Sequence, residues 1–203
     1  GDDTLAYAMA TENLGRANPL WSTELFRALL RNTVFRHGFV NRFADHLNTA
    51  LSAEATKTVV QRVAQAIEAE MPAHIERWGR YAAGQTTYEM PDNCWAEEVA
   101  FIIEWLDERP DRVRQHIVDH FGLSGTYELK LDTDPPDSGT FLLTARTVEA
   151  PFSGRYFQGV PLTITVIPAP GSIFAGWSDP ELGTDMTVVV DPGEDLMLTA
   201  RFE

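Results

Sequence analysis

The feature that most restricts the fold is a change of hydrophobic period at Ser124-Gly125. Before it, apolar residues recur every three to four positions, the spacing of helices with one buried face. After it, Tyr127-Glu128-Leu129-Lys130-Leu131 alternates as a half-buried strand does. We therefore predict the α+β class, with an all-α bundle of five or six helices over residues 1–123 and a small antiparallel β domain over residues 126–203.

Local signals divide these two parts further. Asn32 and Ser52 are good N-cap residues, and Gly122 suits a left-handed helix end. Arg109-Pro110 is expected to end one helix and start another, since proline is tolerated at the first helical position. Irregular structure is predicted for residues 1–21 and 79–92. After the first strand, further strands are predicted at 140–146, 160–167, 173–177, 186–190 and 196–202, between turns rich in proline and glycine.

Charge and cysteine content exclude several classes of function. The 203 residues carry a formal net charge of −14, and both parts of the chain are acidic. No basic stripe is present, which argues against binding to nucleic acid or to anionic lipid. No apolar run is long enough for a membrane span. Cys94 is the single cysteine, which excludes an internal disulfide and a cysteine-rich zinc site. The opening Gly1-Asp2-Asp3, without methionine, is expected of a segment from a longer chain.

Candidate chemical residues in the helical part have ordinary structural explanations. His116 and His120, four apart beside Asp119, could share a metal, but a zinc site needs three or four ligands. Cys94 has no histidine near it in sequence and fits a small buried side chain. The carboxylates of one helix fit a solvated face: Glu97, Glu98, Glu104, Asp107 and Glu108. We assign no catalytic, cofactor-binding or metal-binding residue.

The β part offers two further groups of candidates. Asp132, Asp134 and Asp137 lack the glycine and the final glutamate of a calcium-binding EF-hand loop, so they are interpreted as a turn. Four aromatic residues could form a platform for sugar or peptide: Tyr156, Phe157, Phe174 and Trp177. We favour a core role for them, because a small sheet needs large side chains inside. Gly171 fits a turn with positive φ, and Gly176 fits a close backbone approach.

Several ordered blocks of the helical part resemble a known family. Residues 21–30, 35–36, 39–49, 70–79 and 108–116 look like CotH proteins, bacterial spore-coat-type atypical protein kinases. The resemblance spans about residues 20–122 and implies the C-terminal helical part of that fold. In the family, the ATP- and metal-binding residues lie upstream of these helices. The resemblance therefore implies a non-catalytic fragment of a kinase-like parent, whose own cofactors would be ATP with Mg²⁺ or Mn²⁺.

A second resemblance covers residues 126–203. The blocks at 156–165, 168–171, 174–178 and 198–202 are similar to a bacterial repeat module of the divergent internalin B-repeat kind. Such modules act as spacers or adhesion elements of exported proteins. The resemblance implies an extracellular or cell-envelope location in a bacterium, with a surface protein or carbohydrate as a possible contact.

Three hypotheses follow. In the first, the helices buttress the upstream kinase-like region of the parent, and the β part extends it or attaches it to the cell surface. In the second, the chain is a carbohydrate- or peptide-binding module that uses the β-part aromatics. In the third, an enzymatic site lies at the junction of the two parts, near His116, His120 and residues 124–126.

Overall fold

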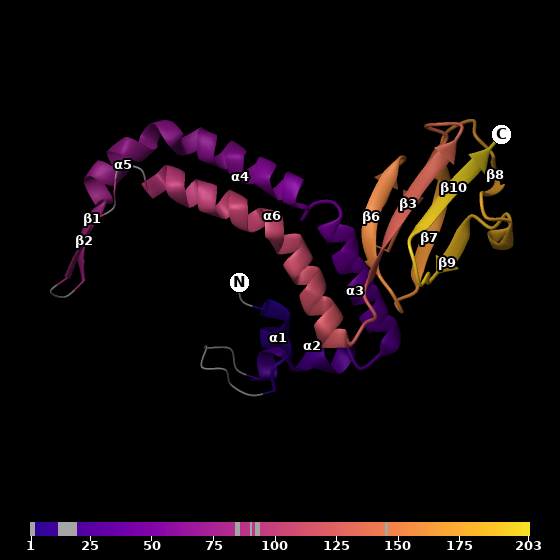
Figure 1. Cartoon of the computed structure of the whole chain (residues 1–203), viewed down its shortest axis with the longest axis horizontal. Helices are drawn as coiled ribbons and strands as arrows, with labels where there is room; N and C mark the ends of the chain where they lie inside the picture. Colours follow the sequence, from indigo (N-terminus) through magenta and orange to yellow (C-terminus); the bar gives the residue numbers. More distant parts are fainter. Residues whose placement is uncertain (1–2, 12–19, 84–85, 90, 92–93, 145) are drawn as a thin grey trace. The chain divides into compact units, whose positions relative to one another are not determined.

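The structure, a computed structural model, describes residues 3–11, 20–83, 86–89, 91, 94–144 and 146–203. It is α+β, as the change of period predicts (Figure 1). The helices are α1 (Thr4–Met9), α2 (Glu24–Leu29), α3 (Thr33–Leu47), α4 (Ala53–Ile67), α5 (Met71–Trp78) and α6 (Cys94–Phe121), with the 3-10 turns η1 (Leu20–Thr23), η2 (Glu68–Glu70) and η3 (Pro180–Leu182). Within the described ranges no helix combines the length and the apolar character needed to cross a membrane.

Ten strands accompany the helices in the described parts of the chain. They are β1 (Arg80–Ala83), β2 (Thr86–Glu89), β3 (Thr126–Asp134), β4 (Gly139–Leu142), β5 (Thr147–Glu149), β6 (Phe152–Phe157), β7 (Leu162–Pro168), β8 (Phe174–Trp177), β9 (Thr187–Val190) and β10 (Leu196–Phe202). We refer to β3 through β10 as the β-module. The chain forms two compact units, one of Gly1–Thr49 with Val113–Glu203 and the other of Ala50–Arg112. The first unit thus combines the leading helices and the end of α6 with the β-module.

Most predicted helix ends are confirmed. The Asn32 side chain accepts the Phe35 N–H at 3.0 Å, and the Ser52 hydroxyl accepts the Ala55 N–H at 3.2 Å. Gly122 ends α6 with φ of 62°. The prediction of irregular structure at 1–21 was wrong for α1, because the Asp3 side chain caps the N–H groups of Leu5 and Ala6 in its first turn. Residues 12–19 of that segment lie outside the described residues.

Two predicted interruptions of helical structure were wrong. α6 continues through Pro110, whose side chain is buried, because the apolar face of the helix continues on both sides of it at Leu106 and Val113. Burial on that face offsets the roughly 3 kcal/mol that an interior proline costs. In the predicted loop at 79–92, β1 and β2 pair antiparallel from Arg80↔Glu89 to Ala83↔Thr86. The run Thr86-Thr87-Tyr88 consists of residues that favour strands. The prediction of a loop gave more weight to the glycine and proline nearby.

The β-module is a sandwich of two four-stranded sheets, ordered β6-β3-β10-β8 and β5-β4-β7-β9. Inward residues of both sheets share one core, where the ring of Phe141 stacks on Trp177 with 6.2 Å between centroids. The predicted antiparallel β domain is confirmed, with one parallel pairing: β10 lies between β3 and β8 and pairs parallel with β3. The strand β6 was missed, because Gly154 interrupts its apolar pattern. Both glycine predictions are confirmed, with φ of 90° at Gly171 and 141° at Gly176.

Candidate functional site

Three polar side chains on one face of α3 contact the β-module. Asn41, Asp45 and Asn48 are spaced four and three residues apart, so they project along one line, and we call them the α3 polar stripe. Asn41 and Asp45 are only 3% and 1% exposed. A helix that buries amide and carboxylate groups needs partners for them, because an unpaired buried polar group costs several kcal/mol. The β-module supplies these partners.

Each residue of the stripe bonds to a different part of the module. The Asn41 amide nitrogen donates to the Pro161 carbonyl at 2.8 Å. The Tyr156 hydroxyl donates to the Asp45 carboxylate at 2.8 Å, within the buried interior. Asn48 donates to the Arg155 carbonyl and accepts the Arg155 N–H, both at 3.0 Å. The stripe therefore fastens α3 to β6 and to the segment that follows it.

The Asn48 amide completes the outer edge of β6. On its other side β6 pairs with β3, so the backbone groups of Arg155 that bond to Asn48 are those an additional strand would take. The close approach needs a glycine at position 154. A Cβ on Gly154 would lie 2.9 Å from the Asn48 amide nitrogen and 2.7 Å from the Phe152 ring. The glycine at position 154 thus leaves the space that Asn48 and Phe152 occupy at this edge.

The Tyr156 hydroxyl is buried against the Asp45 carboxylate. Burial, and then the charge of Asp45 and the hydrogen bond to it, raises the pKa of the Tyr156 hydroxyl. The phenol therefore stays protonated and keeps donating to the carboxylate. Tyr127 lies next to it, with 6.3 Å between ring centroids, and burial raises the pKa of its hydroxyl too, with a contribution from Asp191. Its hydroxyl has no hydrogen-bond partner in the described structure.

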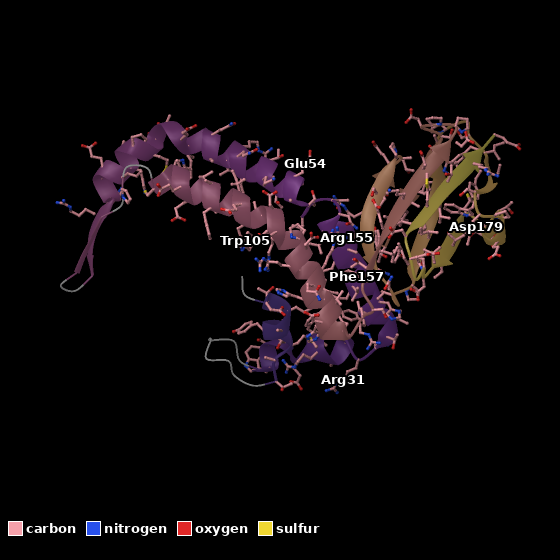
Figure 2. All side chains as sticks on the ribbon, in the orientation of Figure 1. Arg31, Glu54, Trp105, Arg155, Phe157 and Asp179 are labelled. Atoms are coloured by element: carbon pink, nitrogen blue, oxygen red, sulfur yellow. The ribbon has the colours of Figure 1, made fainter. Side chains whose placement is uncertain are left out.

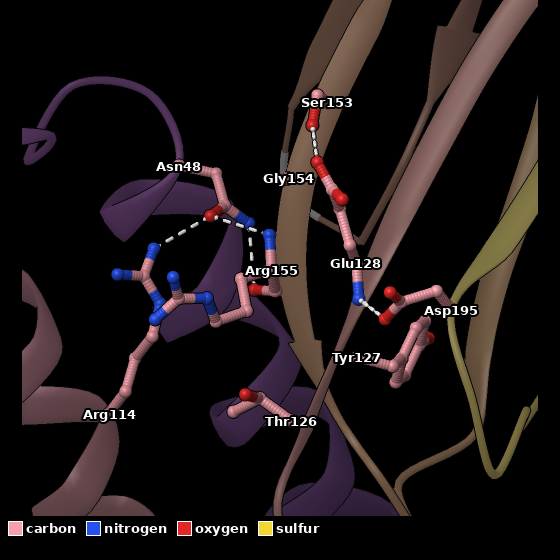
Figure 3. A pocket seen from close by; sticks show the side chains of 9 residues that line it. All are labelled: Asn48, Arg114, Thr126, Tyr127, Glu128, Ser153, Gly154, Arg155 and Asp195. Atoms are coloured by element: carbon pink, nitrogen blue, oxygen red, sulfur yellow. Dashed lines mark hydrogen bonds between the residues drawn. The ribbon is translucent and has the colours of Figure 1, made fainter.

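α6 adds a cation to this junction. The Arg114 guanidinium donates to the Asn48 side-chain oxygen at 2.8 Å and to the Leu47 carbonyl at 3.4 Å. Leu47 is the last residue of α3, where carbonyl groups lack helical partners and a positive charge is favourable. The Asn48 oxygen thus receives two donors, one from α6 and one from β6 (Figure 3). Three elements meet at a single amide.

A polar cleft of about 500 Å³ opens beside Asn48. Figure 3 shows its lining: Asn48, Arg114, Thr126, Tyr127, Glu128, Ser153, Gly154, Arg155 and Asp195. The Ser153 hydroxyl donates to Glu128 at 2.8 Å, and Asp195 accepts the Glu128 N–H at 2.8 Å. The Ser153 hydrogen bond, followed by Lys130, lowers the pKa of Glu128. A carboxylate with a lowered pKa is a weak base, so it does not activate Ser153 as a nucleophile.

The structure separates the proposed histidine pair. The His116 ring nitrogen lies 3.5 Å from the Asp3 carboxylate, whereas the His120 ring packs edge-on against Phe121 at 4.9 Å. Asp119 accepts a hydrogen bond from Gln115 at 2.7 Å. Across the parts of the chain that are described, no three His, Cys, Asp or Glu residues gather so as to hold a metal. Each of these side chains has a local structural partner instead.

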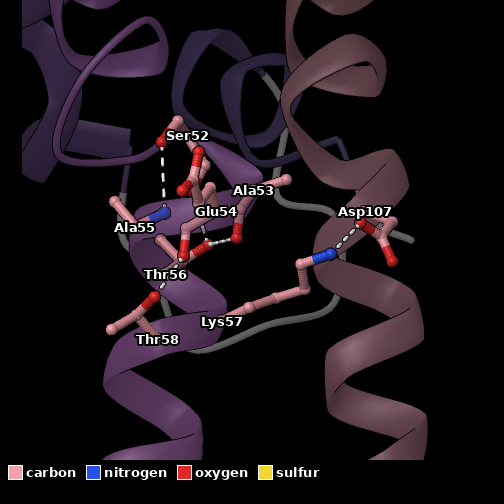
Figure 4. Close-up of polar contacts among 8 residues, drawn as sticks. All are labelled: Ser52, Ala53, Glu54, Ala55, Thr56, Lys57, Thr58 and Asp107. Carbon is pink, nitrogen blue, oxygen red and sulfur yellow. Dashed lines mark hydrogen bonds and ion pairs between the residues drawn. The ribbon is translucent and has the colours of Figure 1, made fainter.

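The acidic candidates occupy solvent-exposed positions. Glu97, Glu98, Glu104, Asp107 and Glu108 are all exposed, which confirms the prediction of a solvated face on α6. Glu108 pairs with Arg112 at 2.6 Å, and Asp107 pairs with Lys57 of α4 (Figure 4). In the β-module, the Asp132 carboxylate accepts the N–H of the next residue at 2.8 Å. Cys94 is half-buried at the start of α6.

The aromatic candidates belong to the interior, which confirms their predicted core role. Tyr156 and Phe157 are fully buried and Trp177 is 3% exposed, while half-buried Phe174 packs edge-on against Trp177 at 5.6 Å. The Trp177 indole nitrogen donates to the Asp185 carbonyl at 2.9 Å. These four side chains cannot form a surface platform for sugar or peptide. The functional residues that the sequence analysis missed are those of the α3 polar stripe, whose four-and-three spacing beside Val40, Ala44 and Leu47 was the available signal.

Comparison with known proteins gives one match. A family model described as CotH kinase protein matches residues 2–113. No curated protein matches the chain, and no solved structure does. The matched segment includes α3 with its polar stripe, but it ends before the β-module begins.

Proposed function

The chain belongs to the CotH kinase family, and from this membership we propose that it is a non-catalytic, structural part of a CotH-like protein. The helices buttress the kinase-like region of that protein, and the β-module serves as a spacer or a surface-attachment element. The protein is exported and works outside the cell or in the bacterial cell envelope, and its module is of the bacterial repeat kind. ATP with Mg²⁺ or Mn²⁺ would belong to the kinase-like region.

One observation carries the structural part of this proposal. The segment that matches the family begins in the same compact unit as the β-module, and the α3 polar stripe of that segment bonds directly to the module. If a flexible tether alone joined the two parts, the faces that meet here would be exposed to water and would have to be polar enough for it. Here the Asp45 carboxylate and the Tyr156 hydroxyl are both inaccessible to solvent. Their contact suits a rigid mount, because breaking it would remove a donor from a buried charge.

The chemistry of the junction agrees with this role. Several of its polar groups bond to one another, as in the bonds of Asn48 with Arg114 and Arg155. Phosphoryl transfer would need a phosphate cradle, a positioned cation and carboxylates that hold a metal ion. Ser153 and Glu128, the hydroxyl and carboxylate that meet in the cleft, lack the basicity that would activate a nucleophile.

The test is a phosphotransfer assay on the full chain. Purified protein would be incubated with ATP and either Mg²⁺ or Mn²⁺, and release of ADP would be followed against a blank without protein. We expect turnover at the level of the blank. Nucleotide hydrolysis or self-phosphorylation above it would contradict the proposal.

A further inference from the structure

An open apolar groove runs between α4 and α6 in the Ala50–Arg112 unit. Its volume is about 280 Å³, and its lining is Gln61, Ala64, Gln65, Glu68, Trp95, Ala96, Val99, Ala100 and Ile103. Alanines from both helices keep the floor low, while Trp95 and Ile103 supply larger apolar walls. The Lys57–Asp107 ion pair joins the two helices beyond Ile103 (Figure 4). The groove is smaller than a typical small-molecule pocket of about 300–1,000 Å³.

The two helices leave much of their apolar surface exposed. α4 is strongly amphipathic, yet none of its residues is buried. Val63 is 54% and Phe101 62% exposed, and Figure 2 shows Trp105 pointing away from α4. Apolar surface of this extent on a helix pair is normally covered by another chain segment. The groove is the part of this exposed apolar surface that has a defined shape.

Carboxylates flank this groove. Glu68 lines it from the turn η2, which follows α4. On α6, Glu104 follows Ala100 by four residues, so it flanks the groove floor, and it is exposed. Lys57, the basic residue at the end of the groove, is engaged with Asp107. The result is an apolar floor with acidic rims.

We propose that this groove binds a polypeptide segment of a partner protein that presents an apolar side chain between lysine or arginine residues. The apolar side chain would enter the groove over Ala64 and Ala100, and the flanking cations would face Glu68 and Glu104. Nucleic acid and anionic lipid carry the wrong charge. A second copy of the Ala50–Arg112 unit is disfavoured as the ligand as well, because residues 50–112 contain 12 acidic and six basic residues.

This inference is independent of the proposed structural role. The groove lies wholly within Ala50–Arg112, whereas the α3 polar stripe belongs to the other unit. The full chain could therefore bind such a segment whether or not it lacks phosphotransfer activity. Its chemistry predicts a salt-sensitive affinity, since exposed charges are screened within about 8 Å at physiological ionic strength.

The experiment is a calorimetric titration of the full chain with two synthetic helical peptides. Both carry the same leucine stripe, flanked by lysine in one and by glutamate in the other. We expect the lysine peptide to bind with micromolar affinity at low salt and to lose roughly tenfold in affinity at 0.5 M salt. The glutamate peptide should bind at least tenfold more weakly. Equal affinity for the two peptides, or none for either, would overturn the proposal.

Variants locate the binding. Ala100→Leu fills the groove floor with a good helix former and should abolish binding of the lysine peptide. Glu104→Lys should weaken it about threefold to tenfold. The control is Glu76→Lys, the same charge change at an exposed position of α5 outside the groove lining. Circular dichroism confirms that each variant is folded. If Ala100→Leu binds like the wild type, or Glu76→Lys weakens binding as much as Glu104→Lys, the groove is not the site.

Discussion

At the scale of single residues, Asp45 is a charged side chain that lies in the protein interior and therefore needs hydrogen-bond partners. Its carboxylate is 1% exposed and accepts a hydrogen bond from Tyr156, which is itself fully buried. A buried carboxylate is tolerated only with strong hydrogen-bond partners. The contact between Asp45 and Tyr156 therefore restricts which side chains both positions can carry. Tyr127 offers a natural comparison, since it is equally buried but its hydroxyl has no partner in the described structure.

Tyr156→Phe should destabilise the protein by about 1–3 kcal/mol, because it removes a donor from a buried carboxylate. Tyr127→Phe removes a hydroxyl that makes no hydrogen bond, and it should change stability by less than about 0.5 kcal/mol. Urea unfolding of both variants and the wild type provides the comparison. Equal effects of the two substitutions would show that the Asp45 contact contributes nothing.

The same tyrosines predict a loss of stability at alkaline pH. The pKa of each hydroxyl is raised in the folded state, so above about pH 10 the unfolded chain releases protons that the folded chain retains. Folding stability should therefore fall as pH rises, by up to about 1.4 kcal/mol per pH unit for each tyrosine. Unfolding at pH 9 and pH 11 should show a smaller drop in the double variant Tyr127→Phe/Tyr156→Phe than in the wild type. An equal drop would assign the effect to other groups.

Gly154 tests the close approach of Asn48. Gly154→Ala places a methyl group within 3.0 Å of the Asn48 amide and the Phe152 ring, so overpacking should cost about 1–3 kcal/mol. Gly193→Ala is the matched control, because nothing lies within 4 Å of a Cβ there. Thermal unfolding should separate the two. A harmless Gly154→Ala would mean that the β6 edge can move away from α3 at no cost.

At the scale of elements, local signals predicted where structure begins better than where it ends. Asn32 and Ser52 marked their helices, because an N-cap acts within a few residues of its own position. Pro110 was misjudged, since its tolerance depends on tertiary packing that local rules do not contain. The parallel pairing of β10 with β3 joins residues that are distant in sequence, and no local pattern encodes it.

The candidate site shows the same limit. The aromatic residues were correctly predicted as core, because composition alone says that a small sandwich needs them. The α3 polar stripe was missed, since polar residues on a helix are ordinarily solvated and nothing in the sequence shows that Tyr156 and Pro161 come to meet them. A polar line beside an apolar one, at Asn41, Asp45 and Asn48, is the signal to seek.

The Ser52 cap offers a test at this scale. Ser52→Ala removes the side chain that accepts the Ala55 N–H and should cost about 1 kcal/mol, whereas Ser52→Asp keeps an acceptor and should cost far less. Hydrogen exchange of the amides in the first turn of α4 reports the difference directly. The same exchange rates in both variants would mean that water caps this helix equally well.

At the scale of the whole molecule, the central feature is the unit in which α3, part of the CotH-family segment, packs with the β-module. Its two parts share one hydrophobic core, to which Val40 and Ala44 of α3 and Ile117 of α6 contribute alongside both sheets. The polar stripe then adds directional contacts to that core. If α3 and the β-module form one rigid body, they should unfold together. If they were separate bodies, they would unfold independently.

Native-state hydrogen exchange of the full chain, with and without Tyr156→Phe, tests this most directly. The account predicts that the amides of α3 and those of β3 and β6 open with the same free energy, and that the substitution lowers both by the same amount. If α3 loses protection while β3 and β6 keep theirs, the helix and the module are separate bodies and the proposed mount does not exist.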